Sequence, residues 1–160
     1  MILEVIKYGN PLLREESKPI EEINEEVINL VNNMFETMYL NHGIGLAAIQ
    51  VGIPKRLFVT DIPDIPNSKL VMINPKIIEF SKEKIIYEEG CLSVPDIEDE
   101  VERSKSIIVE FKDLNGKVKL IKATGLLSVC IQHEYDHLDG ILFIDKALNL
   151  NKEGGKKVKI

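Results

Sequence analysis

The chain has 160 residues, with 20 Lys or Arg against 26 Asp or Glu, so its formal net charge is −6. Hydrophobic residues at 44% and charged residues at 29% are typical of one folded domain and exclude a disordered chain. The negative charge argues against DNA as a partner, because phosphate contacts require a cationic surface. We also expect no membrane partner, because no apolar run approaches ~18 residues. We see no signal or transit peptide, so a cytosolic location is expected.

The strongest helix signal in the first half of the chain begins at Asn24, a residue type favoured at the N-cap. Apolar residues then recur at spacings of three and four, which predicts one buried face: Val27, Val31, Met34, Phe35 and Met38. The run Asn41-His42-Gly43 predicts the end of this helix.

Short strands are predicted next, bounded by Pro and Gly, over residues 56–60, 70–73, 76–80, 85–88, 106–111 and 117–121. Asn115-Gly116 predicts a tight hairpin between the last two. A second helix is predicted from Thr124 to Asp139, ending at Gly140. This order predicts an α+β fold, with mixed or antiparallel sheets around the second helix and the first helix near the N-terminus.

We expect a single catalytic domain over residues 1–145. Residues 146–160 form a short, lysine-rich tail in which Gly154-Gly155 argues against a long helix. We expect this tail to be disordered.

The second predicted helix contains His133-Glu134-Tyr135-Asp136-His137, an H-E-x-x-H run. Residues four apart project from one helix face, so the two imidazoles can bind one metal ion. Glu134 then lies close enough to act as a general base. The alternative is a pair of solvated histidines, which their place on the apolar face of the helix disfavours.

A catalytic site needs a third protein ligand. The extended metalloprotease pattern would require His at position 143, which is Phe143, and no His follows His137. Cys91, in Glu89-Gly90-Cys91-Leu92-Ser93, offers a thiolate that would complete a Cys-His-His site. Cys130 is by contrast interpreted as a small core residue.

Gly43-Ile44-Gly45-Leu46-Ala47-Ala48-Ile49-Gln50 is the third notable segment. Its small residues suggest that the backbone approaches a ligand or another strand closely. Gln50 is the only polar side chain of the segment, so it either satisfies a backbone group or donates within the site. No phosphate-binding loop is predicted, because no Lys-Ser/Thr pair follows.

Together these three segments resemble the peptide deformylase family, which removes the N-formyl group from new bacterial polypeptides. Its pattern combines Gly-φ-Gly-φ-Ala-Ala-x-Gln, Glu-Gly-Cys-φ-Ser and Gln-His-Glu-x-Asp-His. The chain matches all three without a mismatch, at residues 43–50, 89–93 and 132–137.

The resemblance implies a role for each matching residue. Cys91, His133 and His137 would bind one divalent metal ion, with Fe²⁺ preferred and Ni²⁺, Co²⁺ or Zn²⁺ able to substitute. Glu134 would take a proton from the attacking water and pass it to the departing amine. Gln50 and the backbone N–H of Leu92 would hold the oxyanion. The residues expected to admit the substrate backbone and line its methionine pocket are Gly43, Ile44, Gly45, Leu126, Val129 and Cys130.

The resemblance further implies N-formyl-methionyl nascent polypeptides as substrates, a monomer, the bacterial cytoplasm and contact with the ribosome near the exit tunnel. Glu89 and Arg103 are expected to form an ion pair that steadies the Cys91 loop. Two rival functions stay open from the residues alone: an H-E-x-x-H endopeptidase, and a binding module with a structural zinc. The acidic run after Pro95 is interpreted as a solvated loop in preference to a specificity device.

Overall fold

The computed structural model describes residues 1–150. Two helices, seven strands and three short 3-10 turns follow one another in this part of the chain. In chain order they are η1 (Pro11–Arg14), α1 (Glu25–Leu40), β1 (Gly45–Ala47), η2 (Ala48–Val51), β2 (Leu57–Thr60), β3 (Leu70–Phe80), β4 (Lys84–Cys91), β5 (Val94–Ser104), β6 (Ser106–Lys112), β7 (Val118–Thr124), α2 (Gly125–His137) and η3 (Phe143–Asp145).

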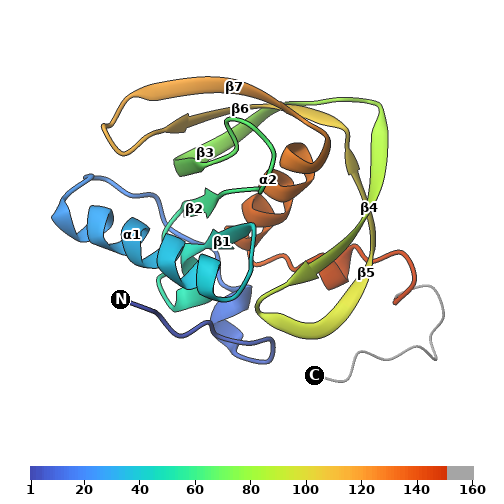
Figure 1. The fold of residues 1–160 in the computed structure, drawn as a ribbon, viewed down its shortest axis with the longest axis horizontal. Coiled ribbons are helices and arrows are strands. Elements are labelled where there is room, and N and C mark those ends of the chain that lie inside the picture. The colour runs from blue at the N-terminus through green and yellow to red at the C-terminus, as the bar shows by residue number, and fades with distance from the viewer. Residues whose placement is uncertain (151–160) are drawn as a thin grey trace.

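The strands form two antiparallel sheets, which confirms the α+β class and replaces the open choice of mixed or antiparallel pairing. One sheet has the order β1-β2-β3-β6-β7, and the other is the β4–β5 hairpin. Helix α2 runs through the middle of the molecule, with the large sheet on one side and the hairpin on the other (Figure 1). The predicted central helix is therefore confirmed.

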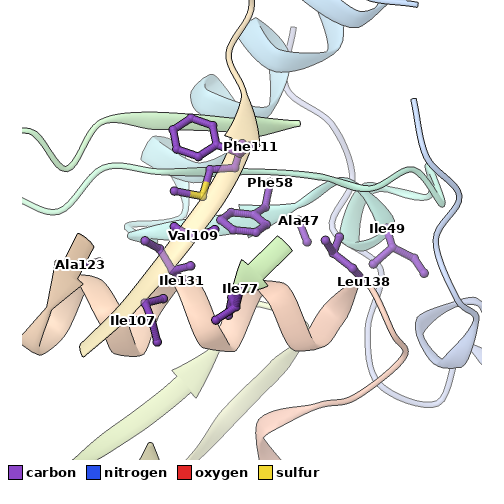
Figure 2. Packing of buried hydrophobic residues seen from close by; sticks show 11 residues of the cluster. Ala47, Ile49, Phe58, Ile77, Ile107, Val109, Phe111, Ala123, Ile131 and Leu138 are labelled. Carbon is purple, nitrogen blue, oxygen red and sulfur yellow. The ribbon is translucent and has the colours of Figure 1, made fainter. Parts of the chain in front are cut away.

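The large sheet is covered by one helix on each face. On one face, Met34 and Met38 of α1 pack in a cluster with Leu57 and Val59 of β2. On the other face, Ile131 of α2 packs in a cluster with Phe58 (Figure 2). Successive side chains of a strand point to opposite faces, so β2, buried at every position, separates the two clusters.

Helix α1 follows its sequence signals closely. Asn24 is the N-cap, and its side-chain oxygen accepts a hydrogen bond from the Val27 N–H at 3.1 Å. The helix ends at Leu40, and the residue with left-handed backbone after it is His42, with φ of 58°, and not Gly43.

Three strand predictions were wrong in detail. The two short strands around Pro75 are one strand, β3, which continues through two register shifts. Asn74 makes this possible, because it adopts a left-handed φ of 50° and bonds through its side chain to Ile20 N and O. β4 extends to Cys91, so the cysteine ends the strand and does not follow it.

β5 was not predicted, because charged residues conceal its alternation of buried and exposed positions. The interpretation of the acidic run after Pro95 as a solvated loop was wrong, since this run is part of the strand. Its buried positions include Asp99 and Arg103 as well as Val101. Asp99 accepts hydrogen bonds from Asn149 and from the Leu150 N–H. Residues 146–150 of the predicted tail therefore lie against β5. The rest of that tail, and with it the predicted disorder, lies outside the described residues.

Among the glycines of residues 1–150, Gly140 should tolerate replacement least. Its φ is +73°, and an added Cβ would lie 2.4 Å from the Arg14 carbonyl oxygen. Gly52 also has a positive φ, of +86°, but an added Cβ would meet nothing within 4 Å. We expect Gly140→Ala to lower the free energy of unfolding by more than the ~1–3 kcal/mol of a left-handed alanine, and Gly52→Ala by no more than that range. Urea denaturation of both variants measures the difference. Equal losses would contradict the proposed backbone collision.

Candidate metal centre and active site

Two elements bring the three predicted metal ligands together. Helix α2 carries His133 and His137 one turn apart, and the end of β4 carries Cys91. One ligand atom from each residue lies within 4.8 Å of the others. Cys91 Sγ is 3.4 Å from His137 Nε2.

This set fits a tetrahedral metal ion. Bonds of ~2.3 Å to sulfur and ~2.0–2.1 Å to nitrogen would hold the ligand atoms about 3.5 Å apart, which is close to the observed sulfur–nitrogen distance. His137 is completely buried, and burial holds its pKa well below the ordinary value, so its ring is neutral as a metal ligand must be. Cys91, His133 and His137 therefore have the donor atoms and the spacing that a divalent metal ion requires.

Glu89 orients His133. Its carboxylate accepts a hydrogen bond from His133 Nδ1 at 2.8 Å, which leaves Nε2 directed to the site. Burial by itself lowers the pKa of His133, yet hydrogen bonds to Cys91 and Glu89 raise it well above its ordinary value. The anionic neighbours that favour a proton on this ring would equally favour a metal cation.

Arg103 holds Glu89 in turn, which confirms the predicted ion pair. The guanidinium donates to both Glu89 oxygens, at 2.6 and 3.0 Å, and to Asp136 Oδ2 at 3.0 Å. Burial by itself raises the pKa of Glu89, but hydrogen bonds from His133 and Arg103 hold it below its usual value. The hairpin and α2 are thus joined by buried charges.

Glu134 lies beside the ligand set, and one of its two carboxylate oxygens has no partner in the described chain. Its Oε2 is 4.0 Å from His133 Nε2, and its buried Oε1 has no hydrogen-bond partner within residues 1–150. Burial raises the pKa of Glu134 to about 7. An orphaned buried carboxylate is costly unless a ligand satisfies it, so this oxygen points to a bound molecule.

Gln50 fulfils both roles that its sequence position left open. Its side-chain carbonyl accepts from the Ala47 N–H at 2.9 Å, which fixes the orientation of the amide. The NH₂ group then donates to Ser93 Oγ at 3.1 Å and faces Cys91 Sγ at 3.5 Å. A side-chain donor is therefore held beside the metal ligands.

A cavity of about 520 Å³ contains the predicted site. Every predicted site residue lines it except His137, which lies fully buried behind it: Gly43, Ile44, Gly45, Gln50, Cys91, Leu92, Leu126, Val129, Cys130, His133 and Glu134. Burial raises the pKa of Cys130 well above its ordinary value, so this thiol stays neutral in the wall. Its interpretation as a buried residue is confirmed.

Sequence reasoning missed two supporting residues. Asp136, inside the H-E-x-x-H run, binds Arg103 and also Lys146 Nζ at 2.9 Å. Phe143, which stands where the extended protease pattern has its third His, stacks on the His133 ring at 6.0 Å between centroids. The spacing of Phe143 from His137 was the signal that could have identified it.

A Cys-His-His set beside a buried carboxylate with one unpartnered oxygen is typical of metal-dependent hydrolases. The model of the polypeptide deformylase family matches residues 2–153. The peptide deformylase of Rhizobium meliloti (strain 1021) is 50% identical over 154 residues, covering 95% of this chain and 88% of the relative.

Solved structures agree. The crystal structure of peptide deformylase from Thermotoga maritima has a TM-score of 0.88 at 40% identity, covering 92% of this chain and 98% of that one. The enzyme of Synechococcus elongatus, in complex with actinonin, has a TM-score of 0.87 at 44% identity, with coverages of 92% and 79%. The chain belongs to the polypeptide deformylase family, the hydrolases that remove the N-formyl group from nascent polypeptides.

The Arg103 network should dominate the stability of the site. The side chains of Arg103 and Glu89 are 2% and 6% exposed. Arg103→Gln would leave buried carboxylates without their cation, so we expect a loss of about 3–5 kcal/mol in the free energy of unfolding. Lys105→Gln, which breaks an exposed pair with Glu83, should cost no more than about 1 kcal/mol. Urea unfolding at matched metal content measures the free energy of unfolding of both variants. Similar losses in the two would contradict the importance of the buried network.

Proposed function

We propose that this chain hydrolyses N-formyl-methionyl peptides to formate and a free amine, with Cys91, His133 and His137 holding one divalent metal ion. The observation that carries this assignment is the convergence of three ligand atoms within 4.8 Å beside Glu134, whose buried Oε1 has no hydrogen-bond partner within residues 1–150. When bound, the metal supplies Lewis-acid polarisation of the formyl group and increases the acidity of water. Formate release from a formyl-Met peptide, with the unblocked peptide as control, tests it.

Glu134 is proposed to carry the proton. It would take one proton from water attacking the formyl carbon and return it to the departing amine. A carboxylate with a pKa of about 7 suits both transfers, because the best acid–base catalyst has a pKa near the working pH.

Gln50 and Leu92 are proposed to stabilise the oxyanion. Gln50 presents a side-chain N–H whose orientation is fixed by Ala47. Leu92 follows Cys91 directly and lines the cavity, where its backbone N–H would provide the second donor. A pre-oriented donor of this kind contributes about 2.7–4 kcal/mol in the transition state.

The methionine side chain is proposed to enter between α2 and the strand β1. Leu126, Val129 and Cys130 form its helix wall, and Gly43 and Ile44 line the same cavity. Gly45 would leave room for the substrate backbone and for the catalytic carboxylate, since an added Cβ would lie 2.6 Å from Glu134 Oε2.

Cellular context completes the proposal. The substrate arises at the ribosome, which supports a cytoplasmic location and an approach to the exit tunnel. The proposed monomer follows from the family resemblance, and the proposed site needs no residue from a second copy. Within residues 1–150 no helix is both long and apolar enough to span a membrane.

Replacing the proposed proton carrier should abolish turnover without removing the metal. Glu134→Gln keeps the shape of the side chain, so we expect at least a ~10²-fold fall in kcat with unchanged metal content. Glu110→Gln, on an exposed position of β6, is the matched control and should behave as the wild type. Metal analysis and formate release measure the two effects. Retention of more than about a tenth of the activity would contradict the role of Glu134.

Fe²⁺ is the proposed working metal, because the family resemblance implies it and a thiolate–imidazole set accommodates iron, nickel, cobalt or zinc. We expect the iron form to lose activity in air as Cys91 oxidises, whereas the nickel form should persist. Cys130, only 5% exposed, is the internal control and should stay reduced. Activity over time and mass spectrometry of both cysteine peptides measure this. An iron form stable for days in air, or a faster zinc form, would contradict the choice of iron.

A further inference from the structure

The mouth of the active-site cavity carries three exposed carboxylates, which we call the acidic rim. Glu88 lies on β4, and Asp96 and Glu98 lie on β5, all lining the same cavity. No Lys or Arg occurs between Glu88 and Glu102 in the sequence. The hairpin thus presents one sign of charge to whatever enters.

The acidic rim has no structural task within residues 1–150. None of its three side chains takes part in a hydrogen bond or ion pair there. Other acidic residues of the hairpin are bound: Glu89 pairs with Arg103, and Asp99 holds Asn149 and Leu150. The carboxylates that stabilise the hairpin are therefore buried against other parts of the molecule. Those of the acidic rim are exposed and remain available to a ligand.

The cavity that the acidic rim borders is built to hold a ligand. Glu134 is only 4% exposed, lines this cavity, and has an unpartnered Oε1. The rim is close to the ligand set, because Cys91 ends β4 and pairs with Val94 of β5. Glu98 lies over Gly90, where an added Cβ would be 3.4 Å from Glu98 Cγ. A peptide bound beside Cys91 would lie near the acidic rim, because Cys91 and the three carboxylates line the same cavity.

We propose that the acidic rim favours formyl-methionyl chains that carry Lys or Arg in the first residues after methionine. This inference rests on the proposed function and names the substrate class of the same site. Three carboxylates raise the local concentration of cationic peptides and attract their side chains. Exposed ion pairs are individually weak, so the preference should be about three- to tenfold in kcat/KM and should reside in KM.

Lys7 is the cation that opposes the acidic rim. It is exposed and lines the cavity, and its neighbours are fixed by hydrogen bonds from Ile6 N to Gln50 O at 2.8 Å and from Tyr8 N to Ser93 O at 2.7 Å. Among residues 1–150 the cavity lining has one lysine against these three carboxylates, so their net charge at the mouth is negative. Lys7→Gln should therefore widen the preference for cationic peptides.

The experiment compares formyl-Met-Leu-Lys-amide with formyl-Met-Leu-Glu-amide on the metal-loaded enzyme. The amides remove the terminal carboxylate, so only the third side chain differs in charge. We expect the lysine peptide to be favoured about three- to tenfold at low salt, and the ratio to approach one near 1 M salt, where screening acts within ~3 Å. Asp96→Asn and Glu98→Gln should each narrow the ratio.

Glu102→Gln is the matched control, because Glu102 is exposed on the same strand, changes the net charge equally and lies outside the cavity. It should keep the full ratio. Equal kcat/KM for both peptides in the wild type would overturn the acidic rim's role and leave the proposed function intact. An equal narrowing by Glu102→Gln would also overturn it, by tracing the preference to net charge. No formate from either peptide would overturn the proposed function itself.

Discussion

The buried carboxylate of Glu89 is the interaction on which the site depends. It joins Arg103 of β5 to His133 of α2, with contacts of 2.6 to 3.0 Å. A buried charge is costly unless it is paired and hydrogen-bonded, so the hairpin is stable only where these two partners meet. Cys91 lies two residues after Glu89 on the same strand, and the same constraint brings its sulfur to the histidines.

The close approach of the backbone to other elements is the second constraint, and it explains the two glycines of the segment 43–50. An added Cβ at Gly45 would lie 2.6 Å from Glu134 Oε2, and one at Gly43 would lie 2.9 Å from Leu92 Cδ1. β1 therefore passes against Glu134 and Cys130 of α2, while η2 immediately after it presents Gln50 to Cys91. The small residues clear space for functional side chains of other elements.

The acidic residues of the β4–β5 hairpin fall into a buried group and an exposed group. Glu89 and Asp99 are buried and bonded, and they connect the hairpin to α2 and to residues 149–150. The carboxylates of the acidic rim are exposed and unpaired within the described chain, so their effect falls on a ligand. One short acidic run thereby serves both the stability of the fold and the electrostatic character of the cavity.

The sequence by itself indicated both helices, the α+β class and the residues that converge on the cavity and its ligand set, because helical spacing and short motifs are local properties. His133 and His137 share a helix face at any position of the helix in the fold. Tertiary structure decided the rest. β5 alternates with buried Asp99 and Arg103, which resemble solvent-facing residues until their partners are in place. The contacts of Asp136, the stacking of Phe143 and the exposure of the acidic rim likewise depend on residues distant in the chain, which only folding brings together.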